Sequence, residues 1–134
     1  MASLIYSHCL LDAMRGLMNF ESDTFSVMLV TGDYVPDRFH TKRSEVYPEA
    51  SGKGYSQQRT SVALDMLNDG AINISLGGVR WKNASVTARY AVYFRDFGGD
   101  AADDDLVACI DFGENVTSTH APFALGDSLL QVVS

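Results

Sequence analysis

The residues best suited to chemistry in this chain are two cysteines and three histidines. They are Cys9, Cys109, His8, His40 and His120. A nucleophilic thiolate needs a base beside it, but His8 and Cys9 are sequence neighbours, and neighbours on a helix point in different directions. Pairing of Cys9 with the distant His120 stays open as an alternative. So sparse a pair of cysteines favours two reduced, buried thiols over a disulfide.

The strongest cluster of charge lies in residues 96–105. Asp100, Asp103, Asp104 and Asp105 supply the carboxylate oxygens that Ca²⁺ prefers, and Gly98-Gly99 could provide the bend. Three adjacent aspartates do not, however, match the spaced ligands of an EF-hand loop. We therefore interpret the segment as a solvated hairpin loop whose charge keeps a sheet edge from pairing, and cation binding there stays open.

The sequence contains no catalytic or cofactor-binding motif. The histidines and cysteines lack the close spacing of metal motifs, and there is no Gly-x-Ser-x-Gly elbow. Gly52-Lys53-Gly54 has no following helix and indicates a bend that leads into a strand, not a phosphate loop. We expect a protein that is not an enzyme and that uses no metal or cofactor.

Aromatic and arginine side chains gather in the irregular segment 32–59. The interaction candidates there are Tyr34, Arg38, Phe39, Arg43 and Tyr47. These residue types are enriched in the cores and hot spots of protein interfaces. Two alternatives stay open: the aromatics could stack on sugars, or they could hold a long loop against a sheet.

One helix is predicted, at residues 4–18, with Ser3 as its N-cap. A broad apolar face at helical spacing should cover the core; it comprises Ile5, Cys9, Leu10, Ala13, Met14 and Leu17. Leu4, Leu11 and Met18 extend the apolar surface around the helix. These three residues are the second group of interaction candidates.

Alternating apolar residues predict the strands. They indicate a strand at 25–31, a hairpin over 60–77, a short strand at 79–81, and longer strands at 86–94 and 106–112. Residues 116–134 are expected to form two or three short strands broken at Pro122 and Gly126. The pattern predicts an all-β fold: residues 1–134 form a single-domain, jelly-roll-like β-sandwich of about seven or eight strands with one short N-terminal helix.

Composition and charge narrow the partners. The 134 residues are 46% hydrophobic and carry a formal net charge of −7, with a pI near 4.7. Direct binding to nucleic acid is not expected, because it needs clustered basic residues. No apolar run is long enough to span a membrane, and the N-terminal residues lack the pattern of a signal peptide. We expect synthesis in a cytoplasm and no membrane partner.

The order of elements resembles small virion structural proteins of tailed bacteriophages, of the capsid cement or head-decoration type. The resemblance covers about residues 4–113 and rests on the order of weak motifs. These are a helix before the strand at 25–31, Tyr34-x-Pro-Asp37, Ser44-Glu-Val46, Ser51-Gly-Lys-Gly-Tyr55, Val79-Arg-Trp81, Thr87-Ala-Arg-Tyr-Ala-Val-Tyr93 and Ile110-Asp-Phe-Gly113.

The resemblance implies a jelly-roll-like fold and a structural role on the outer surface of the capsid. The expected partners are the major capsid protein and further copies of this chain, as a dimer or trimer. The protein would stabilise the shell against the pressure of packaged DNA. A neck or tail connector, or a tail-fibre-associated module that binds carbohydrate or a receptor, is the alternative.

Overall fold

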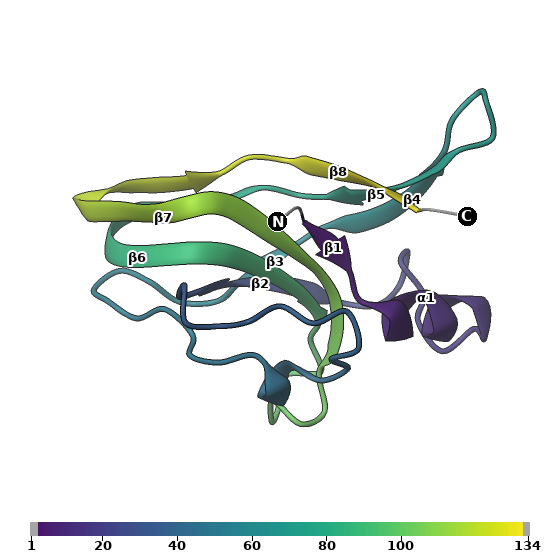
Figure 1. Ribbon diagram of the computed structural model, residues 1–134, viewed down its shortest axis with the longest axis horizontal. Helices are drawn as coiled ribbons and strands as arrows, with labels where there is room; N and C mark the ends of the chain where they lie inside the picture. The colour runs from purple at the N-terminus through teal and green to yellow at the C-terminus, as the bar shows by residue number, and fades with distance from the viewer. Residues whose placement is uncertain (1–2, 133–134) are drawn as a thin grey trace.

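Two antiparallel β-sheets and one short helix make up the chain in a computed structural model that describes residues 3–132 (Figure 1). One sheet has five strands in the order β1-β7-β6-β2-β3, and the other has three in the order β4-β5-β8. The elements are β1 (Leu4–Ile5), α1 (Ser7–Met14), β2 (Phe25–Val30), the 3-10 helix η1 (Arg43–Glu45), β3 (Gln58–Thr60), β4 (Val62–Met66), β5 (Ile72–Leu76), β6 (Val79–Arg95), β7 (Asp105–Leu125) and β8 (Ser128–Val132).

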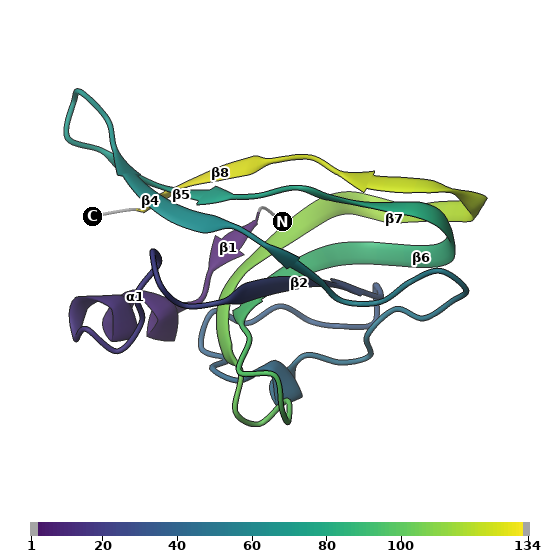
Figure 2. The same ribbon diagram turned by 180° about the vertical axis from the view of Figure 1, so that it is seen from behind.

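The two long strands β6 and β7 pair along almost their whole length and connect the sheets. Their ladder runs from Val79 opposite Leu125 to Arg95 opposite Asp105. It is interrupted by register shifts near Trp81, Ala84 and Ala88, and such irregularities bend a strand. In Figures 1 and 2 the two strands curve together at one end of the molecule, and β7 then leads into β8 in the opposite layer.

The main hydrophobic core lies between the sheets. Its largest members from the five-stranded sheet include Phe25, Leu29 and Tyr93, while Ile74 and Leu76 come from the opposite sheet. Cys9 and Met18 close this core at the helix end. Because each buried aliphatic or aromatic side chain contributes about 1.5–3 kcal/mol, this core is the principal source of stability.

A second hydrophobic core covers the other face of the five-stranded sheet. It contains Met28, Val30, Tyr90, Val92 and Phe94, which alternate with the residues of the main core along β2 and β6. The irregular segment 31–57 contributes Tyr34 and Val46 to this layer, and Figure 1 shows the segment running along that side of the sheet. All six residues of β2 are therefore buried.

The predicted fold class is confirmed as mostly β, with two antiparallel sheets and one short helix. The strand at 25–31 and the hairpin over 60–77 are also confirmed, as β2 and as β4–β5. The break at Gly126 separates β7 from β8. Residues 1–2 and 133–134, which the predicted domain range includes, lie outside the described residues.

The predicted helix at 4–18 is too long at both ends. Leu4 and Ile5 instead form β1, which pairs with Ala108 and Cys109 of β7. The helix begins at Ser7 after Tyr6, and no side chain caps it, so Ser3 is not its N-cap. Backbone pairing to an existing sheet edge competes successfully with the helical pattern there, because it satisfies strand donors and acceptors at once.

The strands predicted at 79–81 and 106–112 are parts of longer ones, and the break predicted at Pro122 within 116–134 is wrong. Val79–Trp81 is the start of β6, and β7 continues through both Gly113 and Pro122. Pro122 is tolerated because it lies opposite the register shift between Trp81 and Ala84, where a missing N–H interrupts no regular ladder.

Candidate interaction surface

Tyr34, a predicted interaction residue, is buried instead of facing outward. It is 3% exposed, and its ring packs edge-on against Tyr90, with 5.9 Å between ring centroids. Its hydroxyl lies 2.9 Å from the hydroxyl of Tyr6 and 2.9 Å from Nδ1 of His40. Burial raises the pKa of Tyr34 to about 12. Tyr34 therefore holds the irregular segment to the sheet, which was the alternative interpretation of these aromatics.

Arg43 also points inward. Its Nε donates a 2.7 Å hydrogen bond to Oδ2 of Asp104, and the two side chains are 16% and 1% exposed. Its guanidinium lies over the ring of Phe94, 5.0 Å from the centroid. Arg43, a predicted interaction residue, is therefore part of a largely buried ion pair, and it also packs against an aromatic ring, as arginine does well.

The acidic loop is solvated only in part, so its interpretation as a solvated loop is wrong for two of its four aspartates. Asp100 and Asp103 are exposed, but Asp104 and Asp105 are buried. Asp105 accepts hydrogen bonds from both Lys42 and Arg95. Burial opposes the ionisation of Asp105, but these two bonds outweigh it and keep its pKa below the ordinary value.

Met18, predicted to extend the apolar surface around the helix as an interaction candidate, belongs to the main core. It is 3% exposed, and its sulfur accepts a hydrogen bond from the Cys9 thiol at 3.6 Å. Conversely, Met14 and Leu17, predicted on the core-facing side, are 88% and 60% exposed. The helix ends at Met14 and the chain turns at Gly16, so the helical spacing no longer describes the residues that follow.

The remaining predicted residues do face solvent or line an open hollow. Leu11 is 40% exposed, Phe39 76% and Tyr47 70%, and Arg38 is exposed as well. Leu4 is half-buried and lines a hollow with a volume of about 670 Å³. The hollow is lined mainly by Leu4, Val35, Pro36, Asp37, Arg38 and Phe39. The structure thus brings Leu4 together with Arg38 and Phe39, although they are far apart in the sequence.

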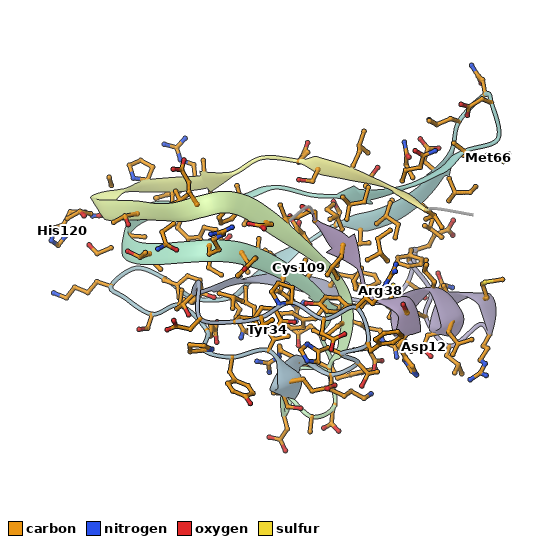
Figure 3. The ribbon with its side chains drawn as sticks, viewed as in Figure 1. Asp12, Tyr34, Arg38, Met66, Cys109 and His120 are labelled. Atoms are coloured by element: carbon orange, nitrogen blue, oxygen red, sulfur yellow. The ribbon has the colours of Figure 1, made fainter. Side chains whose placement is uncertain are left out.

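We call Leu4, Val35, Arg38 and Phe39 the loop surface. Val35 was not among the sequence candidates, yet it is 78% exposed. The signal that could have found it is Pro36: a residue before proline is held extended, and in an extended chain the side chain of Val35 points away from that of Tyr34. Figure 3 shows Arg38 close to β1, between the labelled Tyr34 and α1.

The loop surface is held in place by hydrogen bonds to neighbouring residues. Ser7 donates its backbone N–H to the carbonyl of Arg38 at 2.9 Å, and Phe39 donates to the side chain of Asp37 at 2.9 Å. His40, at the end of the turn, is bonded to Tyr34. The exposed apolar side chains of the loop surface therefore lie on an ordered turn, and less conformational entropy is lost when they bind a partner.

The two thiols, which react as thiolates, are held in their protonated form. Cys9 and Cys109 are free and buried, as the sequence predicts, and burial raises the pKa of each thiol to about 12. His8 contacts Asp12 at 3.1 Å, whereas His120 lies at the far end of the molecule, where β7 bends (Figure 3). Within residues 3–132, no three potential metal ligands lie close enough to hold an ion.

No family model, curated protein or solved structure matches this chain. Among the described residues, no helix is both long and apolar enough to cross a membrane.

Proposed function

We propose that this chain is a non-enzymatic structural protein of a tailed-phage virion, a cement or decoration protein that binds the outer surface of the major capsid protein shell. The observation that carries the proposal is the loop surface: Val35 and Phe39 are both more than three-quarters exposed on an ordered turn. An exposed aromatic beside an arginine and a shallow hollow is the composition of an interface hot spot. The order of sequence motifs supports the virion setting.

Two ion pairs whose carboxylates are buried support a role for the irregular segment in transmitting force. Lys42 and Arg43 tie it to Asp105 and Asp104 at the start of β7. A loop fixed at both its aromatic and its charged contacts transmits force between a partner and the sheet without first unfolding. In this proposal the two sheets form a jelly-roll-like sandwich, and the shell is stabilised because many identical weak contacts act together.

Charge supports the same assignment. With a net charge of −7, free copies repel one another at long range and stay soluble until a complementary surface is offered. The loop surface contributes Arg38 against this acidic background. We therefore expect the contacted area of the shell to combine an apolar depression with acceptor groups.

Cryo-electron microscopy of assembled particles, combined with copy number relative to the major capsid protein, tests the proposal. Hundreds of copies on the shell, with Phe39 in the contact, would support it. Copies confined to a single ring at the neck or tail would overturn the cement role in favour of a connector. Binding of purified protein to shells that lack it should fall for Phe39→Ala and not for Leu129→Ala, an exposed apolar residue on β8 that lies outside the loop surface.

A further inference from the structure

The hairpin formed by β4 and β5 extends beyond the core that its inner face should cover. The register pairs Val62 with Leu76, Leu64 with Ile74 and Met66 with Ile72, so these residues share one face of the sheet. Near the sandwich centre this face is sealed: Val62, Ile74 and Leu76 are at most 3% exposed. Towards the tip Leu64 is 45% exposed and Met66 69%.

The uncovered part of the hairpin lies at the same end of the molecule as α1. Figures 1 and 2 show the hairpin tip projecting past the body, above α1, and Figure 3 places Met66 at its base. A hollow of about 530 Å³ separates the two elements. Its lining includes Ala13, Met18, Phe20, Glu21, Ala63 and Leu64. The apolar face of the hairpin thus continues into a depression at its base.

The single charged residue of β4, β5 and β8, Asp65, lies on the opposite face of the same sheet. The residues that alternate with the apolar ones, Asp65, Asn73 and Gln131, point outward by the strand register. The inner face of the overhang carries Leu64, Met66 and Ile72, with Val132 of β8 opposite Ile72. An edge strand with an uncharged, exposed apolar face and neither proline nor lysine lacks the usual protection against association.

We propose that two copies of this chain associate through this overhang, with Leu64, Met66 and Ile72 of one copy packed on the same residues of the other. A copy with a net charge of −7 repels another wherever carboxylates meet, but not across this uncharged face. A basic partner would select the acidic surfaces instead. In a two-fold contact that runs the two hairpins in opposite directions, the Asp69 residues at their tips lie apart.

The flexible Met66 side chain suits such a contact. Methionine adapts to irregular hollows, and the depression beside Leu64, which Met18, Phe20 and the polar Asn19 and Glu21 also line, offers one in each copy. The packing of Met66 into the partner's depression would cover the exposed apolar area of both hairpins. This proposal does not depend on the cement function, since it concerns the protein free in solution.

Sedimentation velocity over a range of protein concentrations tests the proposal. We expect the wild type to pass from monomer to dimer, and Met66→Glu to raise the dissociation constant at least about tenfold, as for an interface hot spot. Leu129→Glu is the matched control: Leu129 is 66% exposed in the same small sheet, but its register places it on the outer face. It should leave the dissociation constant within about twofold.

A second variant, Leu64→Glu, should act in the same direction as Met66→Glu, and thermal unfolding of each variant shows that the fold is intact. A wild type that is monomeric at every concentration would overturn the proposal. So would a dimer that Met66→Glu leaves intact or that Leu129→Glu disrupts. Association that appears only when empty shells are added, and that Met66→Glu abolishes, would assign the overhang to the shell and also overturn self-association.

Discussion

Arg43 and Asp104 lie 61 positions apart in the sequence, yet the guanidinium Nε is 2.7 Å from the carboxylate. The other Asp104 oxygen accepts the backbone N–H of Phe97 at 2.9 Å, and Arg43 donates its own N–H to the Asp104 carbonyl at 2.9 Å. This pair therefore fixes the irregular segment, the β6–β7 turn and the start of β7 to one another.

Removal of Arg43 should destabilise the protein strongly. Arg43→Ala leaves the Asp104 carboxylate buried without its counter-charge, which typically costs about 3–5 kcal/mol. Urea unfolding followed by circular dichroism measures the loss. Asp103→Ala, at an exposed position of the same loop, should change the free energy of unfolding by less than about 0.5 kcal/mol. Equal losses in the two variants would show that the pair is not a structural tie.

Acid should weaken the fold through Asp105. The folded-state pKa of this carboxyl lies below the ordinary value, since the bonds from Lys42 and Arg95 outweigh its burial. Such a group stabilises the fold at pH values above its unfolded pKa of about 4, and it loses that contribution as the pH falls through the folded value. We expect the Tm to drop below about pH 4.

Measurement of Tm against pH for Asp105→Asn tests this origin. The variant should be less stable at neutral pH, because it gives up both charged partners, but its Tm should fall less on acidification. Asp100→Asn, at an exposed position of the loop, should keep the wild-type slope. An unchanged slope in Asp105→Asn would assign the acid sensitivity to other carboxyls, such as Asp111 beside Arg89.

The hydrogen bond between the buried hydroxyls of Tyr6 and Tyr34 gives a third prediction. Tyr34→Phe keeps the ring against Tyr90 but removes the hydroxyl that lies 2.9 Å from Tyr6, a residue with no exposed surface. Loss of this partner should cost about 1–3 kcal/mol, measured by chemical unfolding. Tyr47→Phe removes a hydroxyl from a residue that is 70% exposed, and it should have no measurable effect. A cost in Tyr47→Phe as large as in Tyr34→Phe would contradict this assignment.

Sequence pattern predicts the strands of this fold better than it predicts its layers. Alternation locates β2 and the β4–β5 hairpin because one face of each is apolar along most of its length. It fails for Tyr34 because burial there depends on a second core on the reverse of the five-stranded sheet. A signal was present: Tyr90 to Phe94 is an unbroken apolar run, which is typical of a strand covered on both faces.

The interaction residues divide along the same line. Phe39 and Tyr47 are exposed as predicted, because they neither pair with a buried charge nor pack into the second hydrophobic core. The sequence alone does not locate Arg43 and Met18, because one sequence does not show which distant carboxylate or hydrophobic core each side chain will contact. Met66 was missed for the opposite reason: its alternation assigns it to a core face, and only the structure shows that this face continues past the core.

The Ser51-Gly-Lys-Gly-Tyr55 segment makes the sharpest test of the fold itself. Its backbone packs directly on β6, where Ser85 donates its N–H to the Lys53 carbonyl at 2.8 Å. A Cβ added to Gly54 would lie 1.9 Å from the carbonyl oxygen of Asn83, and the φ of Gly54 is +81°. Gly98 has nearly the same φ, +79°, but nothing lies within 4 Å of its added Cβ.

The pair Gly54→Ala and Gly98→Ala therefore separates backbone strain from close approach. Gly98→Ala should cost only the left-handed penalty of about 1–2 kcal/mol. Gly54→Ala should cost more by about 1–3 kcal/mol, since the segment must also move off β6 to relieve the overlap with Asn83. Guanidinium unfolding of both variants measures the difference. Similar losses would mean that this segment is not held against β6 in solution, and that the cover it helps form over the sheet is looser than its contacts indicate.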